Sequence, residues 1–284
     1  MKDTSFCSKI QLNIRGKLVE WNGPVVMGIL NATPDSFYSF SRVNEQSIVD
    51  AAGEMLEDGA DILDIGGYSS RPGADEVSEQ EEIDRVIPAI EAVLRSNPDT
   101  ILSVDTFRPR VAKLALETGA GIINDITGGQ FDTDIFKVAG ENMAPYILMH
   151  MRGTPQTMQK LTDYGNLMLE IQQYFSQQVK KAKDAGVKDI ILDPGFGFSK
   201  TLDQNYQLMH NLDLLHLHDL PILVGISRKS MIYKKLGSNA DQSLNGTTAL
   251  NMFALTKGAG ILRVHDVREA KETISLYRTI LGAE

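Results

Sequence analysis

Short apolar runs alternate with longer segments of helical periodicity along most of this chain. The apolar runs span residues 25–30, 61–65, 101–104, 121–123, 146–149, 190–192, 222–226 and 261–264. Apolar residues recur at helical spacing in segments 45–57, 78–94, 110–117, 134–138, 164–185, 202–217, 243–257 and 267–281. Alternation of buried strands with amphipathic helices predicts a parallel sheet covered by helices. Eight such units fit the α/β fold of a closed (β/α)₈ TIM barrel, with a doubly wound open sheet as the alternative.

The first part of the chain predicts a different element. Residues 10–21 alternate loosely between apolar and polar positions around Arg15-Gly16, which is typical of a short β-hairpin. We expect this N-terminal hairpin to close one end of the barrel. Because no linker or change of composition interrupts the later units, a single domain over residues 1–284 is predicted, with the hairpin at 10–21 and the barrel at 25–281.

Composition narrows the class of protein. The 284 residues are 42% hydrophobic and 23% charged, which is ordinary for a globular protein with a sizeable core. The net charge of -9 argues against a general affinity for nucleic acid or for acidic membranes. The single cysteine, Cys7, excludes an internal disulfide and a multi-cysteine zinc site. No signal peptide or transmembrane run is evident, so we expect a soluble cytoplasmic protein.

The stretch D-I-I-L-D-P-G-F-G-F-S-K at residues 189–200 places an acid at the end of a buried strand. Asp193 ends the apolar run, and Pro194 cannot continue the hydrogen-bonded ladder. Gly195 and Gly197 allow a tight turn or the close approach of a flat ligand. A binding site is one interpretation, and an ordinary strand-to-helix loop whose aspartate caps the next helix is the other.

The other strand ends favour the site. Polar side chains stand at or near the end of nearly every predicted strand, at Asn31, Asp64, Asp105, Asn124, Asp125, His150, Asp193, Ser227, Arg228, Lys229, Arg263 and His265. Because the carboxyl ends of parallel strands meet at one rim of a barrel, we expect these groups to converge there.

The converging groups divide into two chemical kinds. Asp105, Asn124 and Asp193 are rich in acceptors and suit a flat heterocycle bearing several N–H donors, with Lys229 offsetting their charge. Phe198 and Met149 are candidates to sandwich such a ring, although core packing is the alternative for Met149.

Arg71, Arg263 and His265 form a cationic set that, with Asn31, suits phosphate or diphosphate. Solvated surface charge is the alternative interpretation for this set.

Eight stretches, in this order, carry a resemblance to a known family. They are MGILNATPDSF (27–37), GGYSSRPGA (66–74), SVDT (103–106), IND (123–125), MHMRGTP (149–155), DPGFGF (193–198), SRKS (227–230) and RVHD (263–266). Over nearly its whole length the sequence resembles the dihydropteroate synthase family, whose fold is a (β/α)₈ barrel.

The resemblance implies an enzyme of folate biosynthesis, a transferase. It would condense (7,8-dihydropterin-6-yl)methyl diphosphate with 4-aminobenzoate, giving 7,8-dihydropteroate and diphosphate, by an SN1-like path. The resemblance places the pterin against Asp105, Asn124, Met149, Asp193, Phe198, Lys229 and Arg263. It places 4-aminobenzoate against Phe37, Ser70, Pro72 and Ser230, and diphosphate against Asn31, Ser70, Arg71, Arg263 and His265.

It also implies the participants in the chemistry. Asp35, Arg71 and Lys229 would be catalytic, and Asn31 would bind Mg²⁺, the one cofactor. Two loops, residues 33–37 and 69–73, would close over the site. The family implies a homodimer, a sulfonamide target, and no nucleic acid or membrane as partner.

The sequence departs from the common family pattern in two places. Tyr68 and Ser70 stand where many members carry Glu and Thr, and Tyr38-Ser39-Phe40-Ser41 replaces a glycine-containing Ser-Asp-Gly-Gly run. These departures bear on loop movement and drug response more than on the reaction. A corrinoid-linked methyltetrahydrofolate methyltransferase and a catalytically silent pterin-binding paralogue are the two competing interpretations.

Overall fold

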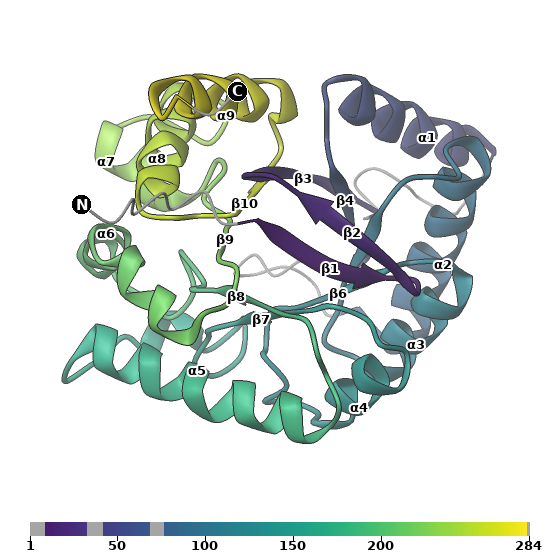
Figure 1. Ribbon diagram of the computed structural model, residues 1–284, viewed down its shortest axis with the longest axis horizontal. Coiled ribbons are helices and arrows are strands. Elements are labelled where there is room, and N and C mark those ends of the chain that lie inside the picture. Colours follow the sequence, from purple (N-terminus) through teal and green to yellow (C-terminus); the bar gives the residue numbers. More distant parts are fainter. Residues whose placement is uncertain (1–8, 33–41, 69–76, 283–284) are drawn as a thin grey trace.

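A computed structural model describes residues 9–32, 42–68 and 77–282. Its centre is an eight-stranded parallel sheet in the order β8-β7-β6-β5-β4-β3-β10-β9. A parallel bridge between Leu192 and Ile222 joins the two ends of this order, so the sheet curls into a barrel (Figure 1). The predicted (β/α)₈ barrel is therefore confirmed, and the open doubly wound sheet is excluded.

The strands lie close to the predicted apolar runs. Their bounds are β3 Val25–Asn31, β4 Ile62–Gly66, β5 Leu102–Asp105, β6 Ile122–Asp125, β7 Tyr146–Met149, β8 Ile190–Asp193, β9 Leu223–Val224 and β10 Ile261–Val264. The run at 222–226 forms only two residues of strand. Pro221 precedes it and has no N–H to donate, although its carbonyl accepts from Leu192 N at 2.9 Å.

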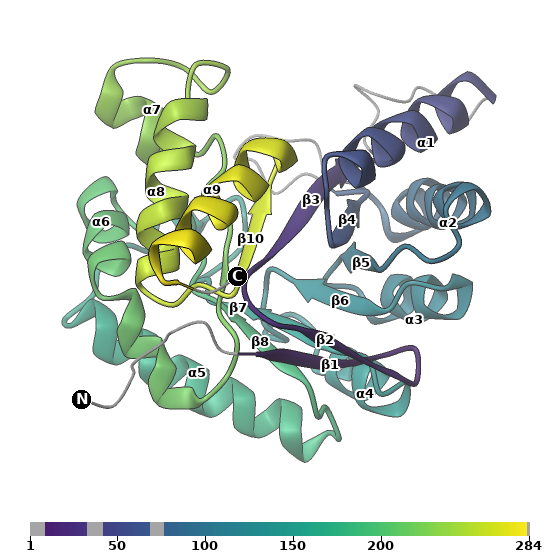
Figure 2. The same cartoon turned by 45° about the horizontal axis from the view of Figure 1, so that its top comes forward.

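The helices form a ring outside the barrel (Figure 2). Their bounds are α1 Arg42–Glu57, α2 Glu79–Ser96, α3 Pro109–Thr118, α4 Asp134–Glu141, η1 Met158–Lys160, α5 Leu167–Asp184, α6 Leu202–His210, η2 Leu212–His218, α7 Ser230–Leu236, α8 Leu244–Thr256 and α9 Val267–Ile280. None of the helices in these described ranges is both long and apolar enough for a membrane crossing.

Two details of the helices differ from the prediction. The segment 202–217 is not one helix, because α6 ends at His210, with Asn211 as its C-cap, and a 3₁₀ helix follows. Asparagine is a poor helix former and a common helix end. The short α7 was not predicted, because seven residues are too few to show a clear period.

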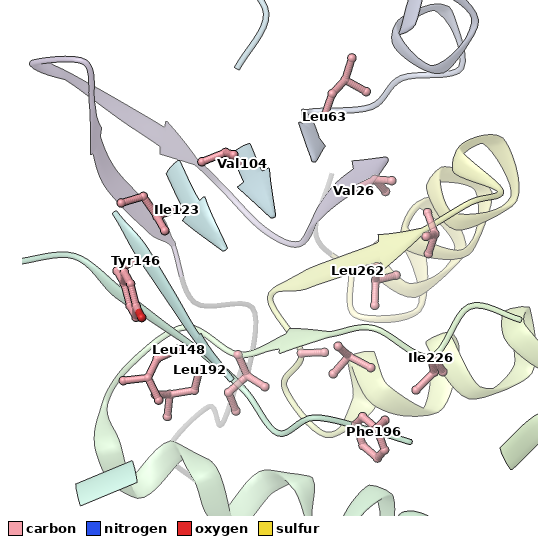
Figure 3. Close-up of a cluster of buried hydrophobic side chains, with 14 of the residues drawn as sticks. Val26, Leu63, Val104, Ile123, Tyr146, Leu148, Leu192, Phe196, Ile226 and Leu262 are labelled. Carbon is pink, nitrogen blue, oxygen red and sulfur yellow. The ribbon is translucent and has the colours of Figure 1, made fainter. Parts of the chain in front are cut away.

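The outward-facing strand residues build the main core. Val26, Leu63, Val104, Leu148 and Leu262 are buried between the sheet and the helices (Figure 3). Helices cover this outer face of every strand, and the other face points into the barrel interior. Because both faces are buried, the strands appear in the sequence as continuous apolar runs.

The predicted hairpin is present and closes the amino-terminal end of the barrel (Figure 1). Strands β1 (Ile10–Ile14) and β2 (Lys17–Trp21) pair antiparallel around Arg15 and Gly16, whose φ angles of 53° and 76° are those of a tight hairpin turn. The buried side chains of β1 pack against the first residues of β3, β4, β6, β9 and β10. The opposite end of the barrel is left for polar groups.

Ser78 is the N-cap residue of α2 and forms a capping box with Glu81. Its side chain accepts from Glu81 N at 3.2 Å, and Ser78 N donates to the Glu81 carboxylate at 2.8 Å. We expect Ser78→Ala to lower the free energy of unfolding by about 1 kcal/mol, measured by urea denaturation. Ser275→Ala, on the exposed face of α9, should change it by less than about 0.5 kcal/mol, and equal effects would contradict the capping role.

Candidate active site

The carboxyl ends of the strands bring four predicted residues into the barrel mouth. Asp105 pairs in register with Asn124 across β5 and β6, and Met149 pairs with Asp193 across β7 and β8. In-register neighbours on parallel strands point to the same face. Asp105, Asn124, Met149 and Asp193 therefore line the same interior surface.

Arg263 of β10 joins two acids, Asp64 of β4 and Asp105 of β5. Its Nε donates to Asp64 Oδ2 at 2.6 Å, and its Nη2 donates to Asp105 Oδ2 at 2.7 Å. The Arg263 side chain is 19% exposed, and Asp64 is fully buried. Burial raises the pKa of Asp105 to about 7, while the charge of Arg263 opposes the shift. The resemblance placed Arg263 with both the pterin and the diphosphate, and in this structure its guanidinium is held by Asp105 of the pterin set and by Asp64.

Asp64 orients a second member of the site. The Asn124 amide Nδ2 donates to Asp64 Oδ2 at 2.8 Å, which leaves Asn124 Oδ1 as an acceptor. Sequence reasoning noted Asp64 inside its strand but assigned it no role. Its signal was present, because an acid inside the apolar run I-L-D-I needs a buried partner.

Asp193, Lys229 and Phe198 form the other side of the mouth. Asp193 Oδ1 accepts from Gly195 N at 2.8 Å, which fixes the carboxylate at the start of the loop. Lys229 Nζ donates to Phe196 O at 2.6 Å and lies 4.7 Å from the centre of the Phe198 ring. Burial lowers the pKa of Lys229 to about 8, and the charge of Asp193 opposes this shift. Burial likewise raises the pKa of Asp193, against the charge of Lys229.

The two phenylalanines of the 193–198 loop face different ways. Phe196 is fully buried in the core between the sheet and the helices (Figure 3). Phe198 instead packs with Met149, Met151 and Met158 in a small apolar cluster at the mouth. Met149 is therefore both a core residue and a wall of the site, and Phe198 supplies a flat apolar face beside Asp193.

Of the residues expected to bind diphosphate, Asn31, Arg263 and His265 lie in the part of the chain that the structure describes. Asn31 is exposed at the end of β3, beside Gly66 of β4. His265 Nδ1 lies 3.0 Å from Ser227 Oγ, so the strand that carries Arg263 is followed by a second polar group at the mouth. Ser230 begins α7 next to Lys229. Asp35, Phe37, Ser70, Arg71 and Pro72 lie outside the described residues, as do Tyr38 and Phe40.

Asn31 fits a magnesium ion carried by a substrate. Within the described residues, no cluster of three or more acidic, histidine or cysteine side chains could hold a metal alone. Mg²⁺ commonly uses one or two protein oxygen ligands together with waters and substrate phosphates. The exposed amide oxygen of Asn31 matches that requirement.

Two other polar groups lie beside the mouth without entering it. Arg228 pairs with Asp266, with its Nε 3.1 Å from Asp266 Oδ2. Tyr68, one of the family departures, meets Phe107 edge-on with ring centres 5.3 Å apart and lines a hollow of about 500 Å³ with Arg108. Phe107 in turn packs against the apolar cluster that contains Met149 and Phe198, so Tyr68 is connected to the site through Phe107.

The backbone at Gly195 allows the loop to lie close to β7. Its φ is 68°, and a Cβ there would lie 2.1 Å from the His150 carbonyl oxygen. We expect Gly195→Ala to lower the free energy of unfolding by about 1–3 kcal/mol more than Gly237→Ala, and to weaken pterin binding. Gly237 has a φ of 64° with no atom within 4 Å, so it reports the backbone strain alone. Equal losses in thermal unfolding would exclude the clash with His150.

The barrel and its mouth define a class of enzyme that binds a flat heterocycle rich in N–H donors. The model of the pterin binding enzyme family matches residues 27–265, and the chain belongs to that family. Within the family it is similar to the dihydropteroate synthases. It is 50% identical over 246 residues to the dihydropteroate synthase of Synechocystis, covering 85% of each chain.

Solved structures agree with this likeness. The Yersinia pestis dihydropteroate synthase, solved with a sulfonamide drug complex, has a TM-score of 0.90 and 42% identity, over 96% of this chain and 100% of that one. The Xanthomonas albilineans dihydropteroate synthase, in complex with 7,8-dihydropteroate, has a TM-score of 0.86 and 32% identity, over 97% and 100% of the two chains.

Proposed function

We propose that the chain joins (7,8-dihydropterin-6-yl)methyl diphosphate to 4-aminobenzoate, giving 7,8-dihydropteroate and diphosphate. The observation that carries the proposal is the row of acceptors formed by Asp105, Asn124 and Asp193 at the barrel mouth. A pterin presents several N–H donors along one edge, and this row matches them. The complex of the Xanthomonas relative with 7,8-dihydropteroate supports the same product.

The residues around the proposed pterin ring would recognise it by hydrogen bonds and cover its two faces. Asp105, Asn124 Oδ1 and Asp193 would accept from the pterin, and Lys229 would donate to it. Phe198 and Met149 would cover the ring faces. Hydrogen-bonded readout of this kind rejects analogues that lack the donors by about 10⁴-fold or more.

The reaction exchanges one bond for another at the methylene carbon. The C–O bond to diphosphate breaks, and its electron pair leaves with the diphosphate. The arylamine nitrogen then donates its lone pair to the carbon and loses one proton. The pterin shares the positive charge left on the methylene, and the carboxylates of Asp105 and Asp193 would stabilise that charge, so an SN1-like path is favoured.

The remaining groups act on the leaving group and the second substrate. His265 and Asn31 would bind the diphosphate, together with Arg71. Magnesium, held by Asn31 and the diphosphate, would supply neutralisation of the leaving group. Ser230 and Lys229 would position 4-aminobenzoate, whose neutral aniline nitrogen needs little activation. Asp35, Phe37, Ser70 and Pro72 complete this assignment from the resemblance.

Diphosphate release by purified protein tests the proposal. The protein is given dihydropterin diphosphate and Mg²⁺, with and without 4-aminobenzoate, and the organic product is identified by mass. Release that requires the arylamine, with dihydropteroate as product, establishes the synthase. Pterin binding without turnover would favour a silent paralogue. If no diphosphate is released, a separate assay with methyltetrahydrofolate and a corrinoid acceptor tests the corrinoid-linked enzyme, which methyl transfer would favour.

A further inference from the structure

Lys200 is a buried cation behind the loop that carries Asp193 and Phe198. It is 4% exposed, although it follows a glycine-rich loop where lysines are usually solvated. Its Nζ lies 2.9 Å from Gly195 O, 3.0 Å from Phe198 O and 3.0 Å from His150 Nδ1. These three contacts match the three donors of an ammonium group.

The contacts of Lys200 and Lys229 together hold the loop from two sides. Lys229 Nζ binds Phe196 O from the mouth, and Lys200 binds Gly195 O and Phe198 O from behind. Three carbonyls of a short loop are thus fixed by two cations from different segments. The orientation of the Phe198 ring depends on this arrangement, because its own carbonyl is one of the three.

His150 takes part as a neutral acceptor. It is buried, and burial lowers its pKa well below the usual value, with Lys200 adding to the effect. A neutral imidazole can accept at Nδ1, so Lys200 remains the donor in this pair. Burial also lowers the pKa of Lys200 to about 7, and the charge of Asp193 opposes that shift.

We infer that Lys200 is a positioning residue for the pterin: it fixes the 194–199 loop and balances the buried charge of Asp193 from the side away from the ligand. The inference rests on the proposed function, because it concerns the same pocket. It differs from a purely structural role in that the charge of Lys200 should influence ligand binding as well as folding.

The charge effect has a defined sign. The groups that act on Asp193 are Lys229, Arg263 and Lys200, all cationic, and each favours its ionised form. The groups that act on Lys200 are Asp193, Lys229 and Arg152, besides its contact with His150. Removing Lys200 takes one cation from Asp193, so the pKa of Asp193 rises. As the pH is lowered, the variant that lacks Lys200 should therefore begin to lose pterin affinity at a higher pH than the wild type does.

Calorimetric titration with dihydropterin diphosphate and Mg²⁺, without 4-aminobenzoate, from pH 5.5 to 8.5 tests the inference. Lys200→Met should weaken binding at least tenfold at pH 7 and move the acid limb of the affinity profile up by roughly one pH unit. Lys200→Gln keeps amide donors for the loop without the charge, so it should lose less affinity at pH 8 and show the same shift.

Tyr146→Phe is the matched control. The Tyr146 hydroxyl is fully buried and donates to Asp125, whose carboxylate also accepts from Thr127 N at 2.7 Å and Gly129 N at 2.7 Å. This variant should lose stability without any change in pterin affinity or in its pH profile.

The outcomes separate the two proposals. If wild type binds and both Lys200 variants bind with its affinity and pH profile, the inference about Lys200 is overturned and the proposed function stands. If neither Lys200 variant folds while Tyr146→Phe does, the role is structural and the inference is overturned as well. If the wild type does not bind the pterin, the proposed function itself is wrong.

Discussion

Replacement of Arg263 by methionine is expected to lower the free energy of unfolding by about 3–5 kcal/mol and to abolish turnover. Arg263 is the cation between Asp64 and Asp105, at 2.6 and 2.7 Å. Methionine fills a similar volume but leaves the fully buried carboxylate of Asp64 and the partly buried carboxylate of Asp105 without their partner. Breaking a buried ion pair from one side is costly because the remaining charge stays desolvated. Urea denaturation and the diphosphate-release assay measure the two effects.

A surface ion pair on the next helix gives the control. Arg268 lies 3.5 Å from Glu272 on α9, with side chains 72% and 64% exposed. Arg268→Met should cost less than about 1 kcal/mol, since water already solvates both charges. A loss of similar size in the two variants would show that Arg263 does not hold the acids as described.

The pH dependence of the Arg263 variant follows from the same acids. The pKa of Asp105 is already raised to about 7 by burial, with Arg263 opposing, so removal of the guanidinium raises it further. A carboxyl with a raised folded-state pKa stabilises the fold fully below its unfolded pKa of about 3.9, and this contribution is lost as pH rises through the folded-state value. Because Asp105 titrates at about 7 in the wild type and higher in the variant, the stability gap between Arg263→Met and wild type should narrow as the pH falls toward about 7 and stay constant below it.

The barrel could be predicted from the sequence because each strand is buried on both faces. Runs such as 190–192 and 261–264 then read as uninterrupted apolar segments, and the helices between them keep a clear period. The short α7 could not be predicted, because it depends on how the chain leaves the sheet after Gly225. The division at Asn211 could not be predicted either, because it depends on how α6 ends. Neither feature changes the apolar pattern enough to be detected.

The site was predicted where strand ends carry it. Asp105, Asn124, Asp193 and Arg263 lie together because parallel strands share one rim. Asp64 was left without a role because its partner Arg263 is 199 residues away in sequence, so nothing near Asp64 in the chain indicates the ion pair.

Lys200 gave no sequence signal, since a lysine after Gly197 and Ser199 is expected to be solvated.

The magnesium ion, the homodimer and the cytoplasmic location stay predictions.

Asp193→Asn is expected to reduce pterin affinity by roughly 10⁴-fold, which places binding below detection by calorimetry. Asparagine keeps the shape of the side chain, and its carbonyl oxygen can still accept from Gly195 N, now 2.8 Å from Asp193 Oδ1. The change therefore keeps the hydrogen bond to the loop but removes a hydrogen-bond acceptor and a negative charge. One acceptor becomes a donor facing the ring N–H groups, and Lys229 loses the negative charge that acts on it most strongly.

Asp189→Asn provides a control on the same segment of chain. Asp189 immediately precedes β8, and its Oδ2 accepts from Asn13 N at 2.7 Å, at the end of the barrel closed by the hairpin. This variant should bind the pterin as the wild type does. Wild-type affinity in Asp193→Asn would sink the role of Asp193, whereas a loss in both variants would indicate a general effect on β8. Because the two aspartates stand at opposite ends of one four-residue strand, the comparison separates recognition at the mouth from the integrity of the barrel.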